Sequence, residues 1–415
     1  MYYLSKYLLW VDSCSNVIQN NNVLFKSQLK QLTMKNSEKI ENKLLKNLKL
    51  CTLPLTHRRS LPFEFYWQNS IFTQEKKRIF TDQWLGLGRA DRLMLPGEYE
   101  ALELCGQALL LIRDQDKALR LYANTCRHRG AKLLEGNGQC QAISCPFHGW
   151  TYSQDGVLIH AKEMDKNPNF DFAEHSLIEY DLKEVEGFLF AFIGSESTSL
   201  EKQLGDFAKL HKPWALNDLV TTRRQAFEVQ CNWKAFLDVF NEYYHLNNVH
   251  PTSIDNLYWE PEESDITLGD YASQFGLTAG TGALLETQQL SSLPKMTSLT
   301  EPWSLGARYS WIFPNMTFAA SQEAIWVYEA TPISSDRCQI RQSICFPKST
   351  TKLPDFNEKS QAYYQRLDDA MSEDIIALEN QHKGLRNSPS LQGQFSPLME
   401  ENVASFCNWY ATRMI

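Results

Sequence analysis

The alternation of hydrophobic and polar positions divides the chain into a β-rich first half and a mixed second half. Short apolar runs separated by polar turns fill residues 95–195, as in β-strands. Within them, ALLLIRDQDKALRLYANT places two runs around Asp114–Asp116 and predicts a hairpin, and GFLFAFIG predicts a buried strand. Residues 85–195 are therefore expected to form a compact, mainly β unit. Aromatic and polar residues alternate again over residues 300–346 and predict further strands.

Helical periodicity occurs in three other segments. The run Gln74–Trp84 carries apolar residues near helical spacing. The segment NWKAFLDVFNEYYHLNNVHP predicts a helix that is closed by Asn247, Asn248 and Pro251. A third segment, KSQAYYQRLDDAMSEDIIALENQHKGL, predicts a long amphipathic helix that ends near Gly384.

These patterns divide the 415 residues into four parts: an N-terminal extension (1–59), a helical lead-in (60–84), the β-rich unit (85–195) and an α+β domain (196–415). The first fifty residues are rich in Asn, Lys and Leu. Lysines with few acids are compatible with a cleavable targeting peptide, but the segment has no Arg and no small-residue cleavage site after an apolar stretch. The composition favours translation from Met34, with residues 1–33 as an extension.

Composition narrows the possible partners and compartment. A net charge of −8 and an isoelectric point near 5.7 argue against a nucleic-acid partner. Apolar runs such as Ala108–Ile112 and Phe188–Ile193 have the length of core strands and are too short to cross a membrane. The ten cysteines are scattered through a long chain, unlike a disulfide framework. We therefore expect buried thiols and a cytoplasmic protein.

Four potential metal ligands lie in two short loops, Cys126-x-His128 and Cys145-x2-His148. Each loop offers one thiolate and one imidazole from a single tight turn. Two thiolates can bind one iron of a [2Fe–2S] cluster and two imidazoles the other. A structural zinc site with the same four ligands is the alternative.

The surrounding residues favour the cluster. The CxHRG and CPxHGW loops closely resemble those of Rieske oxygenases, with Gly130 and Gly149 where the chain must turn sharply. Neither loop carries the additional disulfide cysteine of respiratory-chain Rieske proteins, and Cys140 lies outside both turns. The resemblance implies a [2Fe–2S] cluster bound by Cys126, His128, Cys145 and His148.

A second set of ligands follows at Glu242-x2-His245-x4-His250. Two histidines and a carboxylate form the facial triad of non-heme Fe(II) enzymes, which leaves positions open for O₂. Glu242 and His245 are neighbours on one helix face. His250 would lie about 140° around an ideal helix from His245. We therefore expect the helix to break between the two histidines, at Asn247, Asn248 and the approach to Pro251.

This segment resembles the catalytic motif of Rieske oxygenase α subunits, Asp/Glu-x2-His-x3–4-His. The resemblance implies that His245 and His250 bind the mononuclear iron. It also implies that Glu242 bridges this iron to the cluster of a neighbouring subunit. Most members have Asp at that position, and several amine-oxidising members have Glu. Two surface histidines would be the alternative if no Rieske motif preceded them.

The third iron ligand must come from another part of the chain. The segment SEDIIALENQHKGL resembles the C-terminal helix of the family, in which the Asp of a Glu-Asp pair binds iron. That implies Asp374 as the ligand, with Glu373, Asp369 and Glu379 as the alternatives. The resemblance covers roughly residues 60–390.

The resemblance also implies an architecture and a set of partners. The fold would be α+β, with a β-rich Rieske domain joined to a helix-grip (START/Bet v1-like) catalytic domain around a curved antiparallel sheet. The assembly would be a homotrimer in which electrons cross between subunits. The chain has neither a GxGxxG nucleotide motif nor the cysteines of plant ferredoxins, so NAD(P)H electrons should arrive through a separate reductase or ferredoxin.

The substrate is expected to be a small quaternary or tertiary amine of the choline, glycine betaine or carnitine type. Glu242 and an aromatic-rich region support this, because rings can hold an ammonium by cation–π attraction. The aromatic residues in question are Tyr258, Trp259, Trp303, Tyr309, Trp311, Phe313, Phe318, Trp326 and Tyr328. Most of them should belong to the hydrophobic core. An aromatic acid, hydroxylated or O-demethylated, is the second expectation, and a non-catalytic electron carrier is a remote third.

Overall fold

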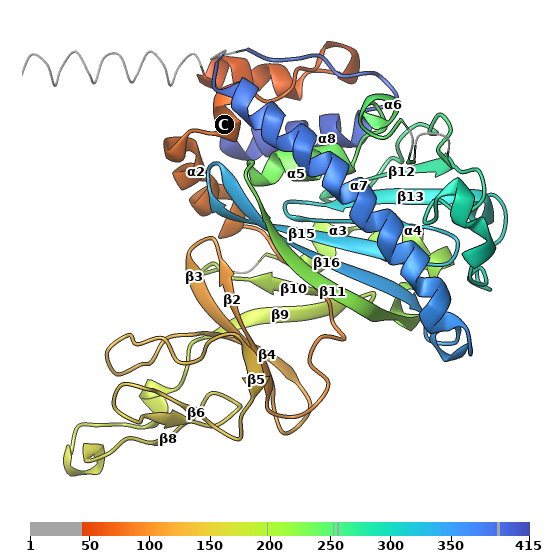
Figure 1. Ribbon diagram of the computed structural model, residues 1–415. Coiled ribbons are helices and arrows are strands. Elements are labelled where there is room, and N and C mark those ends of the chain that lie inside the picture. The colour runs from red at the N-terminus through yellow and green to blue at the C-terminus, as the bar shows by residue number, and fades with distance from the viewer. Residues whose placement is uncertain (1–43, 197, 252, 255–256, 388–390) are drawn as a thin grey trace, which may run out of the picture.

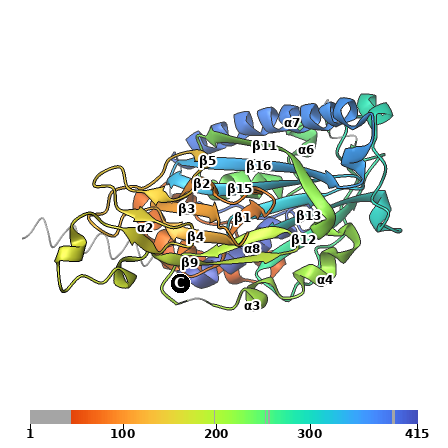
Figure 2. The same cartoon turned by 90° about the horizontal axis from the view of Figure 1, so that it is seen from below.

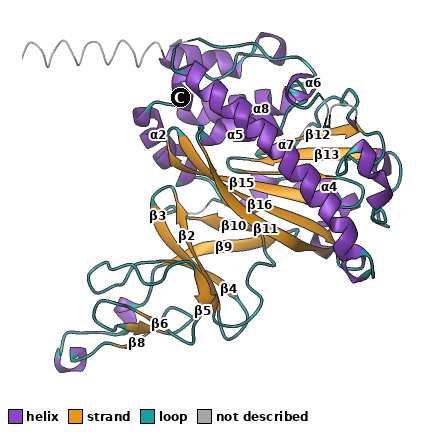
Figure 3. Ribbon diagram, viewed as in Figure 1, coloured by secondary structure: helices purple, strands orange, loops and turns teal. Residues whose placement is uncertain are grey.

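A computed structural model describes residues 44–196, 198–251, 253–254, 257–387 and 391–415. The chain folds into a β-rich domain and a larger domain that combines a sheet with helices (Figure 1). Figure 3 shows that strands dominate the first domain and that most of the helices gather on the second. The α+β architecture with two domains is therefore confirmed.

The first domain is built on a seven-stranded antiparallel sheet in the order β1-β10-β9-β4-β3-β2-β5. Its strands are β1 (Leu85–Arg89), β2 (Glu98–Leu104), β3 (Gln107–Arg113), β4 (Leu119–Ala123), β5 (Asn137–Gln139), β9 (Glu179–Val185) and β10 (Phe188–Phe192). The predicted hairpin is confirmed, since β3 pairs with β4. The buried strand predicted from GFLFAFIG is β10, in which every residue is buried.

A small three-stranded sheet forms the tip of this domain, at the lower left of Figure 1. Its strands are β6 (Ile143–Ser144), β7 (Thr151–Tyr152) and β8 (Leu158–His160). The loop between β6 and β7 carries Cys145 and His148.

The second domain contains a curved six-stranded antiparallel sheet in the order β11-β16-β15-β14-β13-β12. Its strands are β11 (Leu219–Val229), β12 (Tyr271–Leu277), β13 (Gly306–Ile312), β14 (Met316–Ala320), β15 (Ile325–Ser334) and β16 (Arg337–Pro347). The last four strands fall in the region where alternation predicted them.

Seven labelled helices complete the described parts of the chain. They are α2 (Asn69–Glu75), α3 (Leu200–Leu204), α4 (Phe207–His211), α5 (Trp233–Phe240), α6 (Leu246–Val249), α7 (Phe356–Leu385) and α8 (Glu401–Met414). The predicted long helix is α7, which runs along the sheet beside β11 and β16 in both views (Figures 1 and 2). It continues to Leu385, one residue past the expected end at Gly384.

The helix predicted over Gln74–Trp84 was misplaced. The structure has α2 from Asn69, followed by a π-helical turn over Lys76–Phe80. The apolar face begins earlier than the prediction assumed, because Ile71 and Phe72 are already buried in it. Trp84 lies beyond the helix and packs against Phe192 of the β-rich domain.

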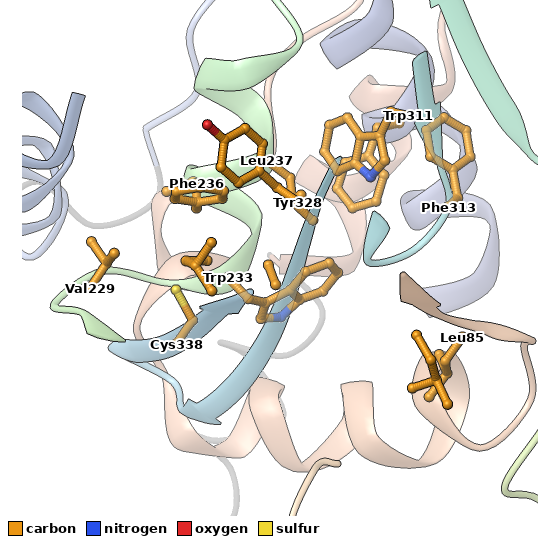
Figure 4. Packing of buried hydrophobic residues seen from close by; sticks show 14 of the residues in the cluster. Leu85, Val229, Trp233, Phe236, Leu237, Trp311, Phe313, Tyr328 and Cys338 are labelled. Atoms are coloured by element: carbon orange, nitrogen blue, oxygen red, sulfur yellow. The ribbon is translucent and has the colours of Figure 1, made fainter. Parts of the chain in front are cut away.

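Packing of α5 against the sheet fixes the segment that follows it. Trp233, Phe236 and Leu237 point from α5 into a core that includes Tyr328 of β15 and Cys338 of β16 (Figure 4). The rings of Phe236 and Tyr328 meet edge to face at 5.7 Å. Because this helix is held firmly, the residues directly after Phe240 start from a fixed position.

The described cysteines agree with the expectation of buried thiols. All nine of those within the described residues are free, and eight of them are buried. Cys14 and the predicted boundary at Met34 lie outside the described residues. A search of the described helices for one long and apolar enough to cross a membrane found none.

His211, at the end of α4, predicts a pH-dependent stability. Its Nδ1 lies 2.8 Å from the carbonyl oxygen of Phe207 and its Nε2 lies 2.7 Å from Ser310 Oγ. Burial lowers the pKa of His211 to about 3. The unfolded chain binds a proton near pH 6.5 whereas the folded chain does not, so His211 makes unfolding easier as the pH falls below about 6.5.

We expect the urea-unfolding free energy to drop between pH 7 and pH 5.5 by about 1 kcal/mol more in the natural protein than in the variant His211→Gln. Other titrating groups affect both proteins alike, so the difference isolates His211. An equal drop in the two proteins would contradict the expectation.

Candidate metal centres

The two loops of the β-rich domain have the same backbone turn. In each, the cysteine N–H donates to the carbonyl five residues on, in Ala131 and Trp150, at 2.8 and 2.7 Å. The glycine N–H donates back to the cysteine carbonyl at 3.0 Å for Gly130 and 3.1 Å for Gly149. Both glycines have positive φ, 77° and 70°. Because a Cβ there would meet no protein atom within 4 Å, it is the backbone conformation that favours glycine.

Sulfur and nitrogen donors occupy different layers of these loops. The thiols of Cys126 and Cys145 belong to residues only 3% exposed, whereas His128 and His148 are exposed. The two imidazole centroids lie 4.7 Å apart, and His128 stacks on Trp150 at 4.7 Å. A bound group would therefore have its sulfur side inside the protein and its imidazole side toward the surface.

Neighbouring side chains influence two of the four potential ligands, Cys126 and His128. Tyr152 Oη lies 3.3 Å from Cys126 Sγ and accepts a hydrogen bond from the backbone N–H of Arg127. Desolvation, then the charges of His148 and Arg129, lower the pKa of His128, which favours the neutral imidazole that a metal needs.

The distances between the donor atoms of the two loops distinguish a [2Fe–2S] cluster from a single zinc ion. Within the described residues, the one group of three or more donor atoms that gathers within 4.8 Å belongs to the other domain. The donors of the two loops are more widely spaced, as two pairs of ligands on two irons must be. The loops therefore fit a [2Fe–2S] cluster better than they fit zinc.

The close group in the second domain consists of His245, His250 and Asp374. Asp374 Oδ1 lies 3.0 Å from His250 Nε2 and 3.5 Å from His245 Nε2. It is buried and makes no hydrogen bond. A carboxylate oxygen without a hydrogen bond, facing two imidazole nitrogens, fits a divalent metal ion of the non-heme iron type.

The Nδ1 atom of each imidazole, on the side away from Asp374, has a carboxylate partner that orients the ring. Glu242 Oε1 lies 2.6 Å from His245 Nδ1, and Glu373 Oε2 lies 2.6 Å from His250 Nδ1. Such partners place the proton on Nδ1 and leave Nε2 free for a metal. Burial alone would lower the pKa of His245, but the hydrogen bond and charge of Glu242 outweigh it and raise that pKa.

The helix breaks at a different place from the one predicted. Asn247 and Asn248 lie inside α6, with His245 as its N-cap residue and His250 as its C-cap residue. The break comes earlier, after Phe240, where the buried Asn241 donates to Leu237 O and accepts from Thr317 Oγ1. A short helix with one histidine at each end lets both rings face Asp374.

Helix α7 brings in the remaining groups. Asp374 lies at the expected place, whereas Glu373 supports His250 and also accepts a hydrogen bond from Ser253 Oγ. Asp369 accepts from Gln365, and Glu379 accepts from the backbone of Gln230. The supporting part of Glu373 was missed, because a Glu-Asp pair does not reveal which histidine its first member faces.

A cavity opens beside His245, His250 and Asp374. Its aromatic walls are Phe240, Tyr243, Tyr258, Tyr309, Trp326 and Tyr328. Tyr309 donates to Tyr258, and the rings of Tyr243, Tyr258 and Tyr309 meet within 6.1 Å of one another. One charged side chain from α7 away from the metal ligands, Arg366, completes the wall.

Four of the nine aromatic residues singled out in the sequence line this cavity. Trp311 and Phe313 instead pack against Phe406, and Phe318 packs against Phe188. Trp303 packs against Phe275, and Trp259 is exposed. Phe240 and Tyr243, which were not predicted, also line it, because Phe240 is the last residue of α5 and Tyr243 lies in the turn that follows.

Two family models match separate parts of the chain. Residues 83–176 match the Rieske [2Fe–2S] domain, and residues 216–415 match the catalytic domain of the ring-hydroxylating alpha subunit. Each match covers one of the two candidate metal centres. The two predicted cofactors, a [2Fe–2S] cluster and a non-heme iron, are those of these families.

Known relatives agree in both sequence and fold. The carnitine monooxygenase oxygenase subunit of Acinetobacter baumannii is 33% identical over 216 residues, which span 50% of this chain and 58% of that protein. The glycine betaine monooxygenase oxygenase subunit of Chromohalobacter salexigens is 22% identical over 388 residues, 86% of each chain. A solved quaternary ammonium Rieske monooxygenase has a TM-score of 0.73 at 25% identity, covering 88% of this chain and 98% of that one.

Both domains of one family therefore follow each other along a single polypeptide, each with the ligand types of its metal centre. The chain thus carries the two domains of the Rieske-type ring-hydroxylating oxygenase alpha subunits, the Rieske domain at residues 83–176 and the catalytic domain at residues 216–415.

Proposed function

We propose that this chain is the terminal oxygenase of a two-component system, and that it hydroxylates a small quaternary or tertiary amine. Cys126, His128, Cys145 and His148 would bind the cluster, and His245, His250 and Asp374 the mononuclear iron. The observation that carries the proposal is the second centre, with its buried Asp374 Oδ1 among two Nε2 atoms, because an electron carrier needs no such site.

The protein's own residues hold the reacting parts in place. When bound, the cluster would supply electrons and the iron would activate O₂. Glu242 and Glu373 hold the protons on the two Nδ1 atoms and so fix the direction of both Nε2 atoms. Glu242 Oε2 also accepts hydrogen bonds from the backbone N–H groups of Tyr244 and His245, which fixes the carboxylate itself. Glu242 is thus hydrogen-bonded both to His245 and to the backbone of Tyr244, whose side chain is exposed at the surface.

Glu242→Gln is expected to slow the reduction of the iron severely while iron content and the visible spectrum of the cluster stay unchanged. A neutral amide keeps the shape but loses the charge and the proton coupling of the carboxylate. The effect should be at least about tenfold, as for other residues that support metal ligands. Single-turnover mixing of reduced protein with substrate and O₂ measures it. Glu262→Gln, an exposed acid, is the control, and normal turnover of Glu242→Gln would remove Glu242 from the route.

The cavity supports the amine class. Rings on several sides can hold a cationic group by cation–π attraction, at roughly 0.5–2 kcal/mol for each contact. The similar proteins are carnitine and glycine betaine monooxygenases, and the similar structure is a quaternary ammonium monooxygenase. Hydroxylation of a carbon next to nitrogen converts its C–H bond to C–OH with one oxygen atom of O₂, while two electrons and two protons reduce the other oxygen atom to water. The hydroxyl group then loses its proton as the C–N bond breaks, so that the amine leaves and the carbon becomes a carbonyl. An N-methyl group then leaves as formaldehyde.

A coupled assay tests the proposal with a reductase, NADH and a panel of choline, glycine betaine, carnitine, stachydrine, benzoate and vanillate. We expect NADH oxidation to depend on at least one of the four ammonium compounds. Turnover of only benzoate or vanillate would reject the amine class in favour of the second candidate, an aromatic-acid hydroxylase or O-demethylase. No turnover of any compound, with three irons bound per chain, would leave the chain without either proposed activity.

We further infer that electrons cross between copies of this chain in a homotrimer. The β6–β8 tip and α6 lie at opposite ends of one chain (Figure 1). Large apolar side chains are exposed near both centres, Phe147 at the first and Tyr244 and Ile376 at the second. A neighbouring copy could bury all three and bring the two centres together. Light scattering that finds a fully active monomer would overturn this arrangement.

Two finer expectations accompany the proposal. The long helix α7 runs along a curved antiparallel sheet, and this arrangement supports the helix-grip description of the catalytic domain. The reductase or ferredoxin would be a separate polypeptide in the cytoplasm, and purified chain alone should not oxidise NADH at the full rate.

A further inference from the structure

Arg366 is a buried cation that has no counter-ion among the residues that the structure describes. It lies on the inner face of α7, is 3% exposed and lines the cavity together with Asp374. Its Nη2 donates to Tyr258 Oη at 3.2 Å, and its guanidinium carbon lies 5.4 Å from the ring centroid of Trp326. Its Nε is buried and has no hydrogen-bond partner. Across the described chain, no carboxylate lies within ion-pair distance of Arg366, although Arg223, Arg308, Arg386 and Arg413 each have one.

A buried guanidinium normally has its donors satisfied. Arg89 is also buried and has no acidic partner among the described residues, and its Nε likewise lacks a hydrogen-bond partner. Its two Nη atoms, however, donate to the backbone carbonyls of Glu186, Leu216 and Leu219. Arg366 instead faces phenols and a cavity. Leaving a charge buried and uncompensated is costly, so a site of this kind favours an anion from outside the chain. A carboxylate is the best match, because it accepts two parallel N–H···O bonds from a guanidinium.

Because the cavity contains both Arg366 and the metal-binding residues, the carboxylate that binds Arg366 would belong to the substrate. Arg366 and Asp374 lie eight residues apart on α7, about 12 Å along the helix axis. A molecule with its carboxylate at Arg366 would therefore extend along the aromatic walls toward His245 and His250. An uncompensated positive charge at one end also disfavours a purely cationic ligand such as choline.

We propose that Arg366 is the specificity-determining residue of the cavity and that the substrate is a carboxylated ammonium compound, a betaine, bound with its carboxylate on this guanidinium. This deepens the proposed function and rests on it for the ammonium half of the ligand. The carboxylate half rests on Arg366 alone.

The test compares the calorimetric binding of two ligands of equal size to the purified full-length oxygenase. One is γ-butyrobetaine, and the other is its primary amide, in which an uncharged carboxamide replaces the carboxylate and the ammonium group is kept. We expect the natural protein to bind the carboxylate roughly 10- to 100-fold more tightly than the amide, which is typical of hydrogen bonds to charged groups. In Arg366→Met this preference should fall to about one, with amide binding little changed. Arg366→Lys should keep part of it. Arg386→Gln, which changes the exposed residue directly after the same helix, should keep all of it.

Equal binding of the two ligands by the natural protein would overturn the proposal, whether or not Arg366→Met folds. So would an unchanged preference in Arg366→Met. Turnover separates this failure from failure of the proposed function. If choline is oxidised as well as the betaines, the amine oxygenase stands and the Arg366 proposal is wrong. If only benzoate or vanillate is oxidised, the amine proposal fails, and Arg366→Met then tests the carboxylate contact on that acid.

Discussion

His245→Ala is expected to abolish turnover while leaving the visible spectrum of the cluster intact. Among the described residues, Nε2 of His245, Nε2 of His250 and Oδ1 of Asp374 converge at the second centre. Removing one of three ligands also leaves Glu242 Oε1 without its imidazole partner, so a carboxylate that is largely shielded from solvent loses one of its hydrogen bonds. The loss in turnover should exceed the 10- to 100-fold typical of residues that merely support a ligand.

Iron content and absorbance measure this prediction together. Iron per chain should fall from three to two, because the mononuclear ion is lost and the two irons of the cluster remain. His160→Ala, an exposed histidine on β8, is the control and should keep three irons and full activity. A variant at His245 that retained three irons and turnover would show that another residue binds the metal.

Cys126→Ser should remove the cluster and, with it, all NADH-dependent turnover. Cys126 is buried beside Tyr152, whose hydroxyl lies 3.3 Å from Sγ, so the serine would sit in a site shaped for a larger, softer ligand. A hydroxyl is a poor replacement for thiolate toward iron–sulfur clusters. The second centre draws no residue from this loop, and its mononuclear iron should be retained.

Visible absorption, iron counting and chemical reduction of the remaining centre measure this outcome. Iron per chain should fall from three to one. Cys140→Ser is the matched control, because this half-buried thiol is free and lies outside both loops. The cluster would not depend on Cys126 if the variant kept its colour, and the zinc alternative would gain if the natural protein bound zinc with no visible absorption.

The sequence by itself determined the chemistry of both centres. The spacings Cys-x-His and Cys-x2-His place one sulfur and one nitrogen in a single turn, and Gly130 and Gly149 take the positive φ that such a turn needs. These are local relations within a few residues, so the order of residue types contains them. The alternation that predicted β3, β4 and β10 is local in the same sense.

Only the tertiary structure decided how distant residues complete the second centre. The side chain of Asn241, bound to Thr317 of β14, ends α5 before the point at which the polar residues of the sequence suggested a break. Glu373 reaches His250 because α7 crosses beside α6. Arg366 is notable because no carboxylate among the described residues lies within ion-pair distance of it, and a missing partner cannot be predicted from its neighbours in sequence. The burial of a side chain and the charges around it depend on every element packed against it. For this reason the role proposed for Arg366 in the cavity followed from the fold and could not be predicted from the motifs.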